Sequence, residues 1–327
     1  MYAIAVENLV KKFGDFTAVN NLSFEIKRGE VFGLLGPNGA GKTTTMSMLS
    51  TMLKPTSGKA SVNGFDIRTN EDDVRKSIGI VFQDQSLDEE LTAYENMDFH
   101  GRLYRIPKDT RQKKIAELLK LVELDDKKDN LVKTYSGGMR RRLEIARGLL
   151  HEPKVLFLDE PTLGLDPQTR NHLWDYIAKL NQEKGITIIL TTHYMEEADK
   201  LCQRIAIIDK GEIIALDTSE KLKNDIGGDV ITIVSSGRDN LYSAIESLPA
   251  IKNIELHDSS ITIGLQNAEK HVAQIVNIAS ENGIPIDSLS IHKPTLEDVF
   301  LHFTGRTIRE EEASTKDKMR MMLKARR

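Results

Sequence analysis

The sequence predicts an α/β fold with a mostly parallel sheet, followed by a smaller α+β domain of ferredoxin-like type. Short runs rich in Val, Ile and Phe alternate with helical patterns up to about Leu216, which is typical of parallel strands covered by helices. From Asp229 the order becomes β-α-β-β-α-β, the order of a ferredoxin-like domain. The chain has 327 residues, which is enough for two such units.

Composition and charge exclude several classes of protein. With 39% hydrophobic and 29% charged residues, the chain is an ordinary globular protein rather than a disordered one. The net charge of -4 gives no basic field for nucleic acid. A single cysteine, Cys202, and a start without a signal-peptide core predict a reducing, cytoplasmic setting. The apolar runs are too short to cross a bilayer, so at a membrane another chain must span it.

The first segment with recognisable chemistry is the glycine-rich loop GLLGPNGAGKTTT. It follows an apolar run, precedes a helical pattern and fits G-x-x-x-x-G-K-[ST]. Backbone N–H groups in such a loop surround a β-phosphate, Lys42 can reach the β and γ oxygens, and the Thr43 hydroxyl can hold Mg²⁺. The alternative is a plain strand-to-helix turn. The expected nucleotide contacts are Gly36, Pro37, Asn38, Gly39, Ala40, Gly41, Lys42, Thr43 and Thr44.

A second segment, KVLFLDEPTLGLD, is an apolar strand that ends in two acids, Asp159 and Glu160. Unpaired carboxylates at a sheet edge are costly unless a cation compensates them. Ligands of parallel sheets bind at the carboxyl ends of strands, so we expect Asp159 to hold Mg²⁺, directly or through water. Glu160 would then polarise the attacking water. The alternative is that these acids only cap the next helix.

Further motifs follow these two segments, and their order is that of the ATP-binding subunits of ATP-binding cassette (ABC) transporters. Residues 5 to 215 therefore resemble such a subunit. IGIVFQ contains a glutamine, YSGGM matches the family signature, LGLD matches its D-loop, and LTTHYMEEAD contains a histidine. An aromatic residue in KKFG stands at the spacing of the ring that stacks on adenine. The residues that carry these matches are Phe13, Gln83, Ser136, Gly137, Gly138, Met139, Asp166 and His193.

The resemblance implies a role for each matched residue. Gln83 would touch Mg²⁺ and water and relay motion to a membrane subunit. His193 would contact the γ-phosphate, and Phe13 would stack on adenine. The signature would bind ATP held by a second copy in a head-to-tail homodimer. A β-rich N-terminal part and a helical subdomain at about 84–150 are implied as well.

The signature departs from the usual family pattern at two positions. Tyr135 replaces the usual leading leucine, and Met139 replaces a frequent glutamine, whose side-chain hydrogen bond is lost. The stretch that follows predicts a helix with Ser136 as N-cap. Glu144 is expected to pair with Arg140 and Arg147 on its surface. The buried stripe would be Met139, Leu143, Ala146 and Leu150.

The C-terminal part resembles one subgroup of the family. LEDVFL followed by TG, within 293–309, is similar to the ending of ATP-binding subunits in type 2 ABC exporters, the group of the daunorubicin-resistance pumps. This resemblance implies export through a separate membrane permease, with the chain at the cytoplasmic face of the membrane. The expected domains are 1–223, a linker at 224–228, a regulatory or dimerisation domain at 229–305 and a charged tail at 306–327.

Two other functions are compatible with a phosphate loop. One is a soluble ABC ATPase that acts on nucleic acid or ribosomes. Members of that kind carry long coiled coils or two cassettes, whereas only about 90 residues without sustained heptads separate the loop from the signature here. The other is a kinase or GTPase, which the signature and His193 disfavour.

Overall fold

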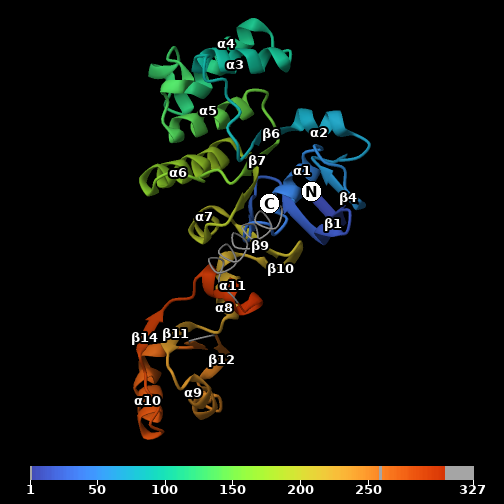
Figure 1. Ribbon diagram of the computed structural model, residues 1–327. Coiled ribbons are helices and arrows are strands. Elements are labelled where there is room, and N and C mark those ends of the chain that lie inside the picture. Colours follow the sequence, from blue (N-terminus) through green and yellow to red (C-terminus); the bar gives the residue numbers. More distant parts are fainter. Residues whose placement is uncertain (1, 258–259, 306–327) are drawn as a thin grey trace, which may run out of the picture. The chain divides into compact units, whose positions relative to one another are not determined.

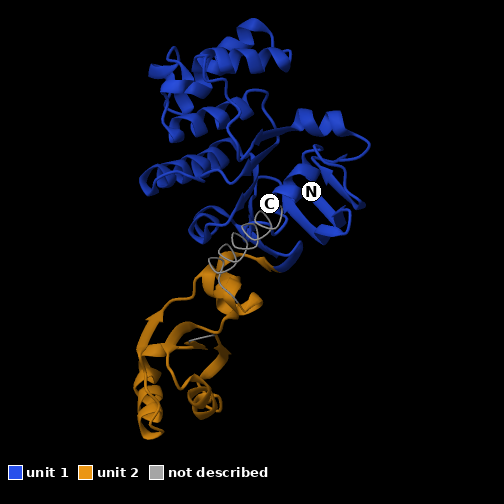
Figure 2. Cartoon of the chain, in the orientation of Figure 1, with its two compact units in different colours: residues 1–214 blue, residues 215–327 orange. Residues whose placement is uncertain are grey.

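The computed structural model describes residues 2–257 and 260–305. The chain forms two compact units, 1–214 and 215–327, which are coloured separately in Figure 2. The expected charged tail lies outside the described residues. Within the described part, no helix combines the length and the apolar character needed to cross a membrane.

The division between the units comes before the boundary at 223 that the sequence suggested. The helix α8 (Ser219–Asp225) belongs to the second unit, because it packs against α11 (Leu296–Thr304) in that unit. The expected linker at 224–228 covers the last two residues of α8 and the turn after it, where Gly227 and Gly228 both have positive φ. Paired glycines therefore mark a turn inside the second unit, and the change of unit precedes them.

The central sheet of the first unit has six strands in the order β10-β9-β3-β8-β7-β6. The pairs from β9 to β6 are parallel. Their carboxyl ends therefore meet at one edge, where the phosphate loop follows β3 and the two acids end β7. Every residue of β3, β7 and β8 is buried, as expected for parallel strands covered on both faces. The strands are β3 (Val31–Leu35), β6 (Ile78–Val81), β7 (Val155–Asp159), β8 (Thr187–Thr192), β9 (Arg204–Asp209) and β10 (Glu212–Asp217).

A second sheet forms the β-rich N-terminal part, with the order β2-β1-β4-β5. Its strands alternate between buried and exposed side chains along much of their length, which is the pattern of an antiparallel sheet with one wet face. The strand β1 ends at Phe13, before a turn at Gly14 with φ +57°. The strands are β1 (Tyr2–Phe13), β2 (Phe16–Lys27), β4 (Ser57–Val62) and β5 (Phe65–Asp66).

The helical subdomain is built from α3, α4 and α5, which Figure 1 shows grouped together. Apolar residues from these helices share one buried cluster, which includes Met97, Ile115 and Leu143. A capping box between Thr92 and Glu95 begins α3. The helices of the first unit are α1 (Lys42–Leu49), α2 (Glu71–Ser77), α3 (Ala93–Leu103), α4 (Lys108–Leu121), α5 (Gly137–Leu149), α6 (Pro167–Lys184) and α7 (Met195–Leu201), with short 3₁₀ turns η1 (Asp125–Lys127) and η2 (Val132–Thr134).

The second unit contains the ferredoxin-like domain that the element order predicted. Its sheet has the order β12-β13-β11-β14, and all neighbouring strands are antiparallel. The apolar faces of α9 and α10 pack on the sheet in one buried cluster. The elements of this domain are β11 (Asp229–Val234), α9 (Arg238–Ile245), β12 (Ile251–Leu256), β13 (Ser260–Leu265), α10 (Ala268–Glu281) and β14 (Ser288–His292).

Candidate functional site

The glycine-rich loop turns sharply between β3 and α1, and its backbone requires glycine at defined positions. Gly39 and Gly41 have φ values of +87° and +101°, a region that other residues rarely adopt. A Cβ on Gly36 would lie 2.1 Å from the carbonyl oxygen of Ile208. The first turn of α1 begins at Lys42 directly after this loop. Free N–H groups at such a helix start form a natural site for phosphate.

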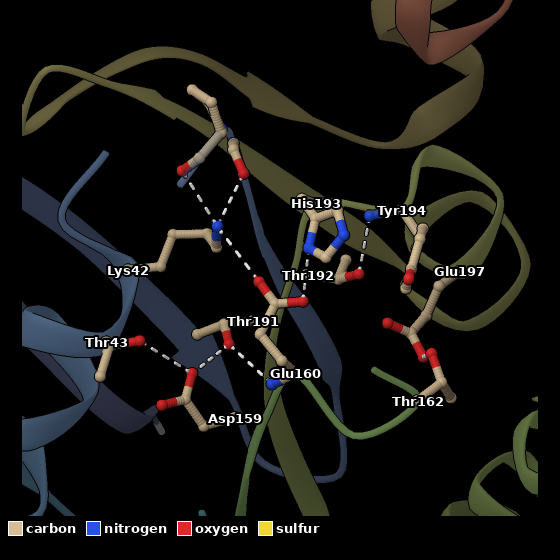
Figure 3. A network of polar contacts seen from close by, with 12 residues as sticks. Lys42, Thr43, Asp159, Glu160, Thr162, Thr191, Thr192, His193, Tyr194 and Glu197 are labelled. Carbon is tan, nitrogen blue, oxygen red and sulfur yellow. Dashed lines mark hydrogen bonds and ion pairs between the residues drawn. The ribbon is translucent and has the colours of Figure 1, made fainter. Parts of the chain in front are cut away.

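Lys42 is buried, and its ammonium group lies at the centre of the site (Figure 3). Its Nζ donates to the carbonyl oxygens of Gly36 and Pro37, at 2.7 and 3.1 Å. It also forms an ion pair with Oε1 of Glu160 at 3.2 Å. The ammonium is thus held inside the loop, where three oxygen atoms replace water around its charge.

Asp159 ends β7 and accepts hydrogen bonds from two hydroxyl groups. The Thr43 hydroxyl donates to Oδ1 at 3.2 Å, and the Thr191 hydroxyl donates to the same oxygen. Burial raises the pKa of Asp159, against the opposing effect of these hydrogen bonds. A nearby cation would stabilise the ionised form. Hydroxyl and carboxylate oxygens are ligands that suit Mg²⁺, so this pair of residues fits the ion.

Glu160 is buried, and its backbone lies in the left-handed region with φ +48°. Its N–H donates to the Thr191 hydroxyl at 3.0 Å. Its Oε2 lies 2.8 Å from Nδ1 of His193. Burial on its own would raise the pKa of Glu160, but the His193 hydrogen bond and the positive charge of Lys42 outweigh it, so the pKa lies below the usual range. The carboxyl group therefore stays ionised at neutral pH.

A second buried acid, Glu197 on α7, lies beside this cluster. Its Oε1 accepts from the Thr162 hydroxyl at 2.8 Å and from Nε1 of Trp174 at 2.9 Å. Burial raises the pKa of Glu197 in spite of these hydrogen bonds. The contacts tie the helix after His193 to the turn after Glu160 and to α6. Sequence reasoning did not single out Glu197, since its partners come from distant parts of the chain.

The structure brings seven of the sequence-predicted residues together. They are Gly36, Pro37, Lys42, Thr43, Asp159, Glu160 and His193, of which Figure 3 labels the last five. The other predicted residues lie outside this set of contacts. Phe13 is 49% exposed at the end of β1, and Gln83 is exposed after β6. Asp166 caps α6, where it accepts from the Thr169 N–H at 3.0 Å.

The signature segment begins α5. The Ser136 side chain accepts from the N–H of Met139 at 3.3 Å, so the predicted N-cap is confirmed. The predicted stripe is also confirmed, because Leu143, Ala146 and Leu150 are buried and Met139 packs against the same cluster. Gly137 is exposed with Ser136, whereas Gly138 is buried.

The predicted surface pairs of Glu144 are wrong. Glu144 is buried and pairs with Arg141 at 2.9 Å. Arg140 pairs with Glu89, and Arg147 donates to Ser86. The prediction assumed an exposed helix face, but Glu144 and Arg141 both point into the protein, where each needs the other's charge. Arg141 also reaches the backbone around Glu160, a role that the sequence analysis missed.

Comparisons with known proteins identify the family of the chain. The profile described as ABC transporter matches residues 19–163. The profile described as ATP-binding protein DrrA1-3-like, C-terminal domain, matches residues 218–304. The chain is thus matched in both of its units.

Two curated relatives match along almost their whole length. The linearmycin resistance ATP-binding protein of Bacillus subtilis is 42% identical over 94% of this chain and 100% of the relative. A daunorubicin resistance ATP-binding protein of Streptomyces coeruleorubidus is 40% identical over 95% of this chain and 99% of the relative. The order of both units is therefore shared with these proteins.

Solved structures show the same fold. A Clostridium perfringens protein described as part of an ABC transporter complex is 31% identical, with a TM-score of 0.64 over 76% of this chain and 96% of its own. A dimeric ATP-binding cassette with bound ADP and phosphate is 30% identical, with a TM-score of 0.59 over 66% of this chain and 98% of its own. The chain belongs to the ATP-binding proteins of the ABC transporter family and is an ATPase of that family.

Proposed function

We propose that the chain couples ATP hydrolysis to export by a membrane permease, with Glu160 as the group that activates water. The observation that carries this proposal is the position of its carboxylate between Lys42 and His193, beside the pair formed by Thr43 and Asp159. An ionised carboxylate can accept a proton from water. His193 fixes the direction of that carboxylate and would face the γ-phosphate.

The same residues would also bind the phosphates of the nucleotide. Phosphate oxygens would lie against the N–H groups of the loop from Gly36 to Thr44, and the Lys42 ammonium would turn from Glu160 to the β and γ oxygens. Thr43 and Asp159 would hold Mg²⁺, with Gln83 as a further ligand. When bound, this ion would offset the negative charge that develops on the phosphates. Phe13 is exposed, with the Lys11 ammonium 5.0 Å from the centre of its ring, and this ring would stack on adenine.

The signature would act on ATP bound to another copy of the chain. Ser136 and Gly137 are exposed at the positive end of α5, and an exposed helix start binds phosphate. In a head-to-tail homodimer, this end would face the γ-phosphate in the partner, with Gly138 and Met139 behind it and Asp166 nearby. A dimeric cassette among the similar structures supports this arrangement. ATP would then close the dimer because both copies contact it.

The relatives support a role in export. They are named for resistance to linearmycin, daunorubicin and doxorubicin, and for Nod factor export. A separate permease would span the bilayer and select the cargo, while this chain would bind to its cytoplasmic face. A soluble ATPase that acts on nucleic acid or ribosomes is the alternative, and these relatives do not favour it.

Co-purification from membranes tests the proposal. The tagged full chain is isolated from detergent-solubilised membranes, and the proteins that accompany it are identified. We expect a polytopic membrane protein that stimulates ATP hydrolysis by this chain and remains bound to a Glu160→Gln variant. Recovery of ribosomes or nucleic acid in its place would contradict export and favour the alternative.

A further inference from the structure

We propose that Arg141 is a positioning residue, which connects the signature helix α5 to the backbone of Glu160 and to the loop that carries Gln83. The inference rests on the proposed role of Glu160 and deepens it. Arg141 lies one turn into α5, and the residue is only 7% exposed. A buried guanidinium group is costly unless each of its N–H groups finds a partner.

All five N–H groups of Arg141 are used. Its Nε donates to the carbonyl oxygen of Pro161 at 2.8 Å. Its Nη2 donates to the carbonyl oxygens of Asp159 and Glu160, at 3.1 and 3.0 Å. Its Nη1 donates to the carbonyl oxygen of Phe82 and to Oε2 of Glu144. One planar side chain therefore binds three consecutive carbonyl groups at the end of β7.

These contacts determine the conformation of the chain where Glu160 lies. The φ of +48° at Glu160 is a conformation that a non-glycine residue adopts only when its surroundings impose it. On one side, its N–H is held by Thr191. On the other side, the carbonyl groups of residues 159–161 point to Arg141. A change in the position of Arg141 would therefore move the carboxylate away from Lys42 and His193.

The side chains of Arg141 and Glu144 hold the loop around Gln83 at both of its ends. The carbonyl group of Phe82 accepts from Arg141. The N–H of Ser86 donates to Oε1 of Glu144 at 2.8 Å. Gln83 itself is exposed between these two anchors. The buried pair Arg141–Glu144 thus links three segments that the proposed mechanism uses: the signature, the end of β7 and the Gln83 loop.

Removal of both charges together separates positioning from simple stability. Arg141→Met alone would leave the carboxylate of Glu144 buried and unpaired, whereas Arg141→Met with Glu144→Met replaces the pair by apolar side chains of similar length, a change that often preserves stability. We expect this double variant of the full chain to stay folded but to melt at a lower temperature, because the carbonyl groups that Arg141 binds lose their donor. We expect its KM for ATP to stay within about twofold of the wild-type value. We expect kcat to fall roughly ten- to a hundredfold, because the catalytic group is misplaced.

Two further variants keep the test decisive. Arg141→Lys retains the charge for Glu144 but cannot reach three carbonyl groups, so it should also lower kcat. It therefore tests the proposal even if the double variant does not fold. Arg142→Met is the matched control, since Arg142 donates to the carbonyl oxygen of Val122 and to the carboxylate of Glu123, away from the site. This control should keep wild-type kcat. Wild-type kcat in a folded double variant, or in Arg141→Lys, would overturn the proposal.

A cycle with Glu160→Gln shows whether Arg141 acts through Glu160. Single-turnover hydrolysis is measured for Glu160→Gln with and without the double substitution of Arg141 and Glu144. We expect no further loss in the Glu160→Gln background, because the group that Arg141 positions is already inactive. A further loss equal to that in the wild-type background would refute this route. Fast hydrolysis by Glu160→Gln itself would instead refute the role of Glu160.

Discussion

The exchange Glu160→Gln separates the proton-accepting role of this side chain from its role in binding. The amide keeps the size of the carboxyl group and its hydrogen bond to His193 but removes the negative charge. Loss of a general base lowers a rate roughly 10²- to 10⁴-fold, which corresponds to about 3–5 kcal/mol in the activation free energy. We expect a decrease of this size in kcat for steady-state ATP hydrolysis.

The Lys42–Glu160 pair predicts the effect of the same exchange on ATP binding. At 3.2 Å, two unit charges attract each other by about 5 kcal/mol at an effective dielectric constant of about 20, and desolvation of both ions offsets most of that gain. The variant frees Lys42 for the phosphates without this competition. We therefore expect ATP to bind equally well or up to about tenfold more tightly, measured with a fluorescent nucleotide.

Glu90→Gln is the matched control for Glu160→Gln. Glu90 is exposed and pairs only at the surface with Lys133, so the same chemical change should leave kcat and ATP binding unchanged. Near wild-type turnover in Glu160→Gln would refute the role of Glu160 as base. Loss of ATP binding in that variant would show that its carboxylate serves the binding site instead.

Three other variants test separate parts of the site. Gly36→Ala forces a Cβ to within 2.1 Å of the Ile208 carbonyl oxygen, so thermal unfolding should show a loss of about 1–3 kcal/mol, and ATP binding should weaken. Glu197→Gln should raise the free energy of unfolding at pH 7, because burial raises the pKa of Glu197 above its ordinary value of 4.5. The wild type loses stability as the pH rises from 4.5 towards the folded pKa, so this gain should vanish near pH 4. Met139→Gln adds a side-chain donor at the signature and should tighten ATP binding up to about tenfold.

For each of these variants, one result would contradict the prediction. An unchanged melting temperature for Gly36→Ala would mean that the backbone at Ile208 yields. Glu196→Gln, at the exposed neighbour of Glu197, is the control for pH-dependent stability. If Glu197→Gln still raises the free energy of unfolding at pH 4, the raised pKa of Glu197 is not the cause of the gain. Unchanged ATP affinity for Met139→Gln would show that this side chain does not reach the nucleotide.

The sequence predicted the parts of the site that depend on local spacing. The phosphate loop, the acids after β7 and the N-cap Ser136 each follow from a few neighbouring residues. The element order also predicted the ferredoxin-like sheet, because the alternation of strands and helices decides that topology. These features depend on short-range geometry, which the order of residues contains directly.

The sequence could not predict contacts that depend on burial and on distant backbone. Glu144 has three arginines within helical reach, and only the packing of α5 shows that Arg141 is the buried one. The other partners of Arg141 are backbone carbonyl groups. Every residue has one, so the residue types give no sign of which of them Arg141 binds. The sole local signal was an acid between two apolar residues, Leu143 and Ile145. The division between the two units also depends on packing, since α8 belongs to the second unit through its contact with α11.

The central claim is that two copies of the chain close around ATP, with the signature of one copy on the nucleotide of the other. Sedimentation of full-length Glu160→Gln with and without ATP and Mg²⁺ tests it most directly. We predict a monomer without ATP, a dimer with ATP, and loss of that dimer when Ser136→Arg blocks the start of α5. A chain that stays monomeric at saturating ATP, or a dimer that Ser136→Arg leaves intact, would contradict the claim.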